Sequence, residues 1–149
     1  MTLKQELKTT FLQRLDDKIE ALRGIVEDLA ADAQSDAKSS AGDKHETALS
    51  MMHLEQENIT KKIQESLDLR EVVKRIDENR NSEVVEFGCV VKVNTVYLFL
   101  AAALPKVTVD EISVLGVSMD APIAKALVGR KLYDSFSFNN CEFTVNFLE

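Results

Sequence analysis

The chain has 149 residues, enough for one ordinary domain or for a long helical element joined to a small second domain. Its formal net charge of −7 argues against a general nucleic-acid-binding protein, because such proteins carry a basic surplus that neutralises phosphates. We therefore expect any contact with nucleic acid to be indirect. A hydrophobic content of 45% excludes a disordered chain.

Two further features of composition bear on localisation. The first ten residues, MTLKQELKTT, show no positively charged segment followed by an apolar run, so we expect no secretory signal. The longest apolar stretch, residues 96–104, has about half the ~20 residues that a membrane helix requires. Cys89 and Cys141 have no nearby histidines and predict neither a zinc site nor a disulfide framework, so we expect both to be ordinary packing residues. We expect a cytoplasmic monomer without membrane contacts.

The first predicted element is a long helix that starts near Thr2, where Thr2 and Gln5 can form a capping box. Its apolar residues recur at alternating spacings of three and four, which is the pattern of a coiled-coil seam. The seam consists of Leu12, Leu15, Ile19, Leu22, Val26, Leu29 and Ala33.

A second long helix is predicted to begin after Gly42. Its apolar seam is less regular, because Gln56 and Arg70 stand where an apolar residue is due. If the chain folds back at about residue 40, the two seams meet, with Leu22 opposite Ile59 for example. The pattern predicts an antiparallel coiled-coil hairpin with its turn between about residues 35 and 43 and a length on the order of 50 Å.

After residue 80 the composition changes to that of strands. Segments 81–102 and 109–119 are rich in β-branched residues, and Phe136 alternates with serines before an Asn139–Asn140 turn, which predicts a β-hairpin. A short helix is predicted over residues 121–129, opened by Asp120 and Pro122. The sequence thus predicts an α+β fold, with a coiled-coil domain over residues 1–80 and a small antiparallel sheet domain with one short helix over residues 81–149.

Charge is distributed unevenly along the predicted hairpin. Residues 24–57 contain eight acidic residues and two lysines, a net charge of −6. Within this stretch, Asp43 and Glu46 lie three residues apart at the start of the second helix. Such spacing is typical of a capping box, which needs no further function. Two exposed carboxylates could instead share a divalent cation, but a complete site requires more oxygen ligands, which a partner would have to supply.

Two motifs resemble those of the bacterial Gre transcript-cleavage factors. GDKHETA (residues 42–48) is similar to the family's tip motif, roughly G-D-x-x-E-N-A. VSMDAPIAKALVGRKLYD (residues 117–134) is similar to its more specific C-terminal motif, and VVEFGCVV (residues 84–91) resembles its first strand after the coiled coil. The resemblance covers nearly the whole chain in order and spacing.

The resemblance implies a fold and a function. It implies an antiparallel coiled coil followed by an FKBP-like domain that docks on RNA polymerase at its secondary channel. Asp43 and Glu46 would then help hold a Mg²⁺ ion at the polymerase active site, where backtracked RNA is cleaved. Asp120 and Pro122 would belong to the docking surface.

The chain departs from the family pattern at four positions. Thr47 stands where Asn is usual, Ser50 where an aromatic residue is common, Ala121 where Ser precedes the proline, and Tyr133 where Gly is usual. The changes at Thr47 and Ser50, near the tip, bear on the stimulation of RNA cleavage more than on polymerase binding.

Three functions therefore compete. The first is a Gre-type elongation factor that stimulates the polymerase's own cleavage activity. The second is a regulator that occupies the secondary channel and inhibits without cleavage, and the third is a coiled-coil adaptor whose tip acids are only a cap. We expect no enzyme activity from the chain alone, since it shows neither a nucleophile with its base nor a complete metal site.

Overall fold

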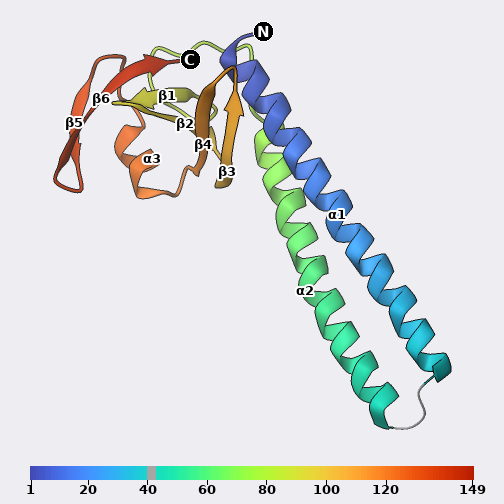
Figure 1. Cartoon of the computed structure of the whole chain (residues 1–149). Coiled ribbons are helices and arrows are strands. Elements are labelled where there is room, and N and C mark those ends of the chain that lie inside the picture. The colour runs from blue at the N-terminus through green and yellow to red at the C-terminus, as the bar shows by residue number, and fades with distance from the viewer. Residues whose placement is uncertain (40–42) are drawn as a thin grey trace. The chain divides into compact units, whose positions relative to one another are not determined.

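The computed structural model describes the backbone of residues 1–39 and 43–149 and the side chains of residues 1–32 and 46–149. Two N-terminal helices precede a six-stranded mixed sheet and a short helix, so the predicted α+β class is confirmed (Figure 1). The elements in chain order are α1 (Leu3–Ser39), α2 (Asp43–Lys74), β1 (Val90–Val93), β2 (Val96–Ala101), β3 (Leu104–Val109), β4 (Ile112–Ser118), α3 (Pro122–Leu127), β5 (Ser135–Phe138) and β6 (Cys141–Leu148).

Helix α1 begins with the predicted capping box. The Thr2 N–H donates to Gln5 Oε1 at 3.1 Å, and the Gln5 N–H donates to Thr2 Oγ1 at 3.2 Å. These bonds satisfy N–H groups near the helix start that have no partner within the helix. The helix continues to Ser39, beyond the residue at which the predicted turn starts, and α2 begins directly after Gly42 as predicted. Residues 40–42, in the predicted turn, lie outside the described part of the chain.

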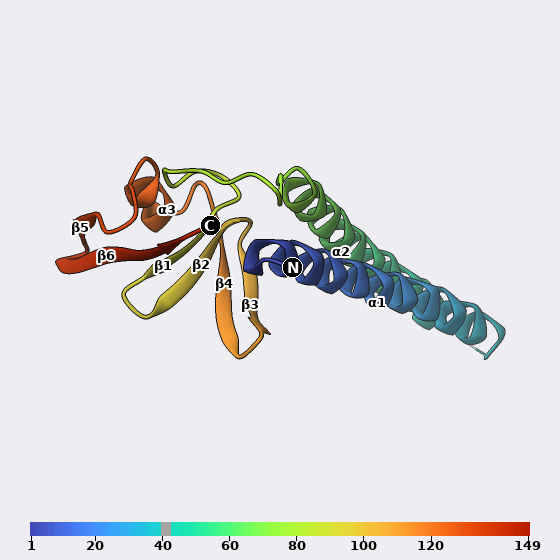
Figure 2. The same cartoon turned by 90° about the horizontal axis from the view of Figure 1, so that it is seen from above.

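The two polar residues that interrupt the seam of α2 bond to α1. Arg70 Nε lies 2.6 Å from Asp16 Oδ1 in an ion pair, and Gln56 Nε2 donates to the Val26 carbonyl at 3.4 Å. The later residue of α2 thus meets the earlier residue of α1, so the helices run in opposite directions, as Figures 1 and 2 show. Because each polar residue has its partner on the other helix, both contacts favour one register of the pair.

The sheet has the strand order β3-β4-β2-β1-β6-β5. Its neighbouring strands are antiparallel except for β2 and β4, which pair in parallel. The prediction of an antiparallel sheet is therefore wrong at this pair. The reason lies in the connections: residues 102–103 lead from β2 directly to the edge strand β3, and a hairpin then returns β4 to the space between them. Asp110 and Glu111 form that hairpin turn with φ of 49° and 68°.

The predicted C-terminal hairpin is confirmed. Strands β5 and β6 pair with Phe136 opposite Phe143, and Asn139 and Asn140 have φ of 51° and 62° in the turn. Asparagine tolerates this left-handed conformation better than most residues, which explains the turn's composition. The rings of Phe136 and Phe143 stack with centroids 5.8 Å apart on the buried face.

Both faces of the central strands are covered. Along β2, Leu98 and Leu100 belong to a cluster that includes Ala124 and Leu127 of α3. Phe99 points to the opposite face, where its ring lies 5.4 Å from the ring of Phe11 of α1. The start of α1 is therefore part of the core around the sheet.

Gly116 of β4 lies where another strand approaches closely. A Cβ atom at this position would be 2.6 Å from the Ala102 carbonyl oxygen and 3.1 Å from Leu104 Cβ. The two-residue connection between β2 and β3 thus runs against the backbone of β4, which requires a residue without a side chain.

We expect Gly116→Ala to lower the free energy of unfolding by about 1–3 kcal/mol, because backbone atoms would have to move. Gly24→Ala is the matched control. Gly24 lies inside α1 with no atom within 4 Å of an added Cβ, so this change should stabilise the protein by about 0.5–1 kcal/mol. Urea unfolding of both variants measures the difference, and a stable Gly116→Ala protein would contradict the close approach.

The described chain divides into two compact units. The sheet unit comprises Met1–Gln13 and Glu71–Glu149, and the helical unit comprises Arg14–Arg70. The division falls within α1 and α2, whereas the sequence prediction places its domain boundary between residues 80 and 81. Among the helices of the described residues, none is long and apolar enough to cross a membrane.

Candidate functional site

The predicted acidic pair lies at the start of α2. The helix begins at Asp43, whose side chain lies outside the described residues, and Glu46 three residues later is exposed. Within the described side chains, no group of three or more His, Cys, Asp and Glu residues could hold a metal ion. That set does not include Asp43, so a shared cation at Asp43 and Glu46 stays a prediction.

The acidic stretch around this pair faces solvent. Six of its eight acidic residues have described side chains, and all six are exposed: Glu27, Asp28, Asp32, Glu46, Glu55 and Glu57. In the same stretch, Met51 and Leu54 of α2 are 67% and 62% exposed. The helical unit therefore presents a negatively charged surface, which attracts cationic surfaces and metal ions.

The predicted docking residues lie just before and at the start of α3. Asp120 and Pro122 are both exposed, and Pro122 is the first residue of the helix. The prediction that Asp120 opens the helix is wrong, because the N-cap is Ala121 and no side chain bonds to the first turn. The Asp120 N–H instead donates to Ser118 Oγ at 3.2 Å, which shapes the turn that precedes the helix.

The segment after α3, residues 128–133, carries exposed apolar side chains. Val128 is 47%, Leu132 41% and Tyr133 73% exposed. The backbone of this segment is fixed, since the Gly129 N–H donates to the Val85 carbonyl at 2.8 Å and the Tyr133 N–H donates to the Val145 carbonyl at 2.7 Å. Apolar side chains are thus held in solvent by an ordered backbone.

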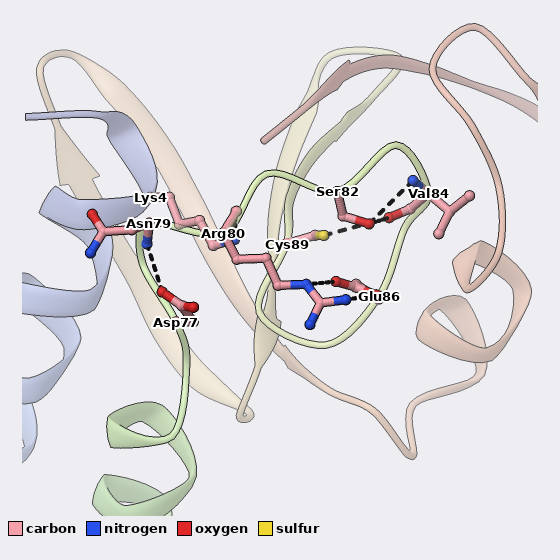
Figure 3. A network of polar contacts seen from close by, with 8 residues as sticks. All are labelled: Lys4, Asp77, Asn79, Arg80, Ser82, Val84, Glu86 and Cys89. Carbon is pink, nitrogen blue, oxygen red and sulfur yellow. Dashed lines mark hydrogen bonds and ion pairs between the residues drawn. The ribbon is translucent and has the colours of Figure 1, made fainter.

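A polar network joins α1 to the connection between α2 and β1 (Figure 3). Lys4 is only 3% exposed, and its Nζ donates to the Arg80 carbonyl at 2.8 Å. The Lys4 N–H donates to Glu149 Oε1 at 2.8 Å, so a carboxylate also stabilises the start of α1. Lys8 Nζ donates to the Ile76 carbonyl at 2.6 Å. Two lysines of α1 thus bond to the first part of this connection, at Ile76 and Arg80.

A pocket of about 250 Å³ lies beside this network. Within it, Arg80 Nε lies 2.8 Å from Glu86 Oε1 in an ion pair. The pocket is lined by Arg75, Asp77, Arg80, Glu86 and Phe87, so its two cations are balanced by two acids. This balance favours no charged class of ligand.

The two cysteines differ in environment. Cys89 is buried, its Sγ donates to the Val84 carbonyl at 3.8 Å, and burial raises the pKa of its thiol. A protonated, buried thiol is chemically inert, which agrees with the predicted packing role. Cys141 is exposed and free at the start of β6, so the packing interpretation does not hold for it.

The pKa of Glu6, in the sheet unit, is shifted. A hydrogen bond with Asp110 raises the pKa of Glu6 above its ordinary value of 4.5, and partial burial and the Asp110 charge act in the same direction. The nearby N-terminal charge acts in the opposite direction. Glu6 lies in the first turn of α1, and Asp110 lies in the β3–β4 turn. The folded protein therefore favours the protonated form of Glu6.

The raised pKa of Glu6 predicts a pH dependence of stability. The folded state binds the Glu6 proton more tightly than the unfolded state, so its contribution to stability falls as pH rises above 4.5 through the raised pKa. We expect Glu6→Gln to reduce the loss of stability between pH 5 and pH 7. The urea midpoints of wild type and variant at both pH values measure this effect. Glu20→Gln, at an exposed position of the same helix, is the control, and equal pH dependence of all three proteins would contradict the prediction.

Sequence reasoning missed the network around Lys4 and the exposed segment 128–133. A lysine in the first turn of an amphipathic helix is ordinarily solvated, so no local pattern indicates that Lys4 is buried. For segment 128–133 a signal exists, because Tyr133 departs from the family pattern at a position where glycine is usual.

No protein-family model and no curated protein matches this sequence.

Proposed function

We propose that the protein is a transcription elongation factor of the Gre type, which binds RNA polymerase in its secondary channel and stimulates cleavage of backtracked RNA. The proposal is supported by the resemblance of residues 42–48 and 117–134 to the two motifs of that family. An elongation factor of this type acts in the cytoplasm, and its function requires no enzyme activity of the chain alone.

The single observation that carries the proposal is the position of Glu46. It is exposed near the start of α2, a helix of 32 residues that runs beside α1, a helix of 37 residues. A cap of α2 requires neither such length nor the exposed acidic residues around it. A carboxylate that must reach a remote active site requires both the long helices and the acidic residues around it.

The finer fold assignment belongs to this proposal. We propose that the helices form an antiparallel coiled-coil hairpin and that the sheet with α3 is FKBP-like. The hairpin is supported by the burial of Leu15, Ile19 and Ile59 along the predicted seams and by the Asp16–Arg70 and Val26–Gln56 contacts.

The chemistry assigned to the tip is metal-assisted hydrolysis. Asp43 and Glu46 would each offer carboxylate oxygens, which are the ligands that Mg²⁺ prefers, and the polymerase would supply the remaining ligands. The ion would stabilise negative charge on the scissile phosphate and lower the pKa of the attacking water. In this scheme the chain contributes ligands and position, and the polymerase contributes the active site.

Docking is assigned to the sheet unit. Asp120 and Pro122 are exposed beside α3, in the motif that resembles the family most specifically. The Asp120 carboxylate offers a polar contact, and Pro122 offers an apolar contact. Because the proline ring is rigid, its burial against a partner costs no side-chain conformational entropy.

A binding and cleavage experiment with purified RNA polymerase tests the proposal. The wild-type protein should bind the polymerase and accelerate RNA cleavage in a stalled, backtracked complex with Mg²⁺. Asp120→Asn/Pro122→Ala should weaken binding, whereas the control Glu111→Gln/Pro105→Ala, which changes an exposed acid and an exposed proline of the same unit, should not. Binding without accelerated cleavage would favour a channel-occupying regulator, and absence of binding would favour an adaptor.

A further inference from the structure

Residues 128–133 gather three of the exposed large apolar side chains of the sheet unit. Val128, Leu132 and Tyr133 are 47%, 41% and 73% exposed, and six consecutive residues span at most about 20 Å. Single exposed apolar residues are common, but several within one short segment mark an interaction surface. We call this set of three side chains the apolar segment.

Tyr133 has an unusual backbone for a large residue. Its φ is 71°, in the left-handed region that glycine adopts without strain and that bulky residues rarely enter. The hydrogen bond from its N–H to the Val145 carbonyl holds this conformation. Because the side chain is 73% exposed, its packing within the protein offsets little of the energy cost of this strained backbone. This indicates that Tyr133 serves binding and not the stability of the fold.

The charges around the apolar segment differ from those of the whole chain. Residues 120–134 contain three cations and two acids, Asp120 and Asp134, which is a net charge of +1 in a chain whose net charge is −7. The Asp134 carboxylate accepts a hydrogen bond from the Lys131 N–H at 2.8 Å. Arg130 is engaged internally, since its Nε donates to the Ala126 carbonyl at 3.1 Å and its guanidinium lies 5.1 Å from the Phe136 ring centroid. Lys125 and Lys131 are exposed. Their ammonium groups complement an acidic partner surface.

We propose that Tyr133 is the anchor by which the sheet unit docks on RNA polymerase, at a surface where acidic side chains surround an apolar pocket. This inference rests on the proposed function and adds to it an anchor residue and the chemistry of the surface contacted. Tyrosine is among the residues that dominate binding energy at interfaces, because its large rigid ring buries much area with little loss of freedom. Lys125 and Lys131 contribute to orientation and to the rate of association.

The test is Tyr133→Gly, measured by titration of purified RNA polymerase with the full chain. Glycine relieves the backbone strain, so the variant folds, with thermal stability near or above that of the wild type. Its affinity for polymerase should fall about tenfold or more. The matched control is Val96→Ala, which shortens an apolar side chain that is 49% exposed in β2, and it should bind as the wild type does.

A second variant tests the charge. Lys131→Glu should weaken binding most at low salt, and the difference from the wild type should shrink as salt screens the interaction. Lys106→Glu, an equal change of charge at an exposed position of β3, should have a smaller effect.

The outcomes separate this inference from the proposed function. If the wild type binds polymerase and Tyr133→Gly binds equally well, the anchor is wrong and the proposed function stands. If the wild type does not bind, both fail. If Tyr133→Gly instead changes the oligomeric state in light scattering while polymerase binding persists, the segment serves self-association and the inference is overturned.

Discussion

Replacing Asp43 with Asn and Glu46 with Gln is expected to abolish stimulated cleavage of backtracked RNA while polymerase binding persists. The two changes remove the negative charge and keep the size of the side chains. Metal-assisted stabilisation of the transition state is worth several kcal/mol, so stimulated cleavage should fall about 100-fold or more. A cleavage assay on a stalled complex, together with a binding titration, measures both parts of this prediction.

The capping interpretation predicts a different result for the same double variant. Asparagine caps a helix about as well as aspartate, so only helix stability would change, by about 1 kcal/mol or less. The control is Glu55→Gln/Glu57→Gln, which removes equal charge from exposed positions of the same helix. Equal stimulated cleavage by wild type and Asp43→Asn/Glu46→Gln would exclude the tip acids as metal ligands.

Phe11→Ala is expected to lower the free energy of unfolding of the sheet unit by about 3–5 kcal/mol. Phe11 is 1% exposed, and the Phe99 ring against which it packs is fully buried, so truncation leaves a cavity. The loss is a large fraction of the total stability of about 5–15 kcal/mol that is typical of a domain.

Urea unfolding followed by circular dichroism measures this loss. Leu54→Ala is the control, because Leu54 is 62% exposed on α2 and its truncation should change stability by about 0.5 kcal/mol or less. Similar stability of Phe11→Ala and the wild type would show that the start of α1 does not belong to the core around the sheet.

The elements that local pattern determines were predictable from the sequence. The spacing of apolar residues predicts both long helices, because their period is sustained over many turns. The alternation of phenylalanine and serine with the Asn139–Asn140 turn predicts the C-terminal hairpin, because both signals act over a few residues. The Thr2–Gln5 capping box is equally local.

Features that depend on distant residues were not predictable. The parallel pairing of β2 and β4 depends on which strand occupies the edge, and no local pattern determines this. The hairpin turn at Asp110 and Glu111 contains neither glycine nor asparagine, the residues that usually indicate such a turn in a sequence. The cap of α3 was assigned to Asp120 because aspartate is a frequent N-cap, but the helix starts one residue later.

The roles of the candidate site residues stay predictions, and only their exposure can be compared with the structure. Sequence reasoning selected Glu46, Asp120 and Pro122, and all three are exposed, as residues that meet a partner must be. It noted that Tyr133 stands where glycine is usual but did not select it as an anchor, because its exposure does not follow from neighbouring residues. It also did not predict the burial of Lys4, which depends on a carbonyl that comes 76 residues later.

The division of the chain has a consequence for biosynthesis. Because Met1–Gln13 belongs to the sheet unit, this segment cannot reach its final partners until the ribosome has added the helical unit and β2. At a translation rate of about 5–20 residues per second, Phe99 is synthesised roughly 5–20 seconds after Phe11. During that interval the side chain of Phe11, which is buried in the folded protein, lacks the Phe99 ring against which it packs. Chaperones that bind exposed apolar side chains should therefore associate with residues 1–13 during translation and leave once β2 has emerged.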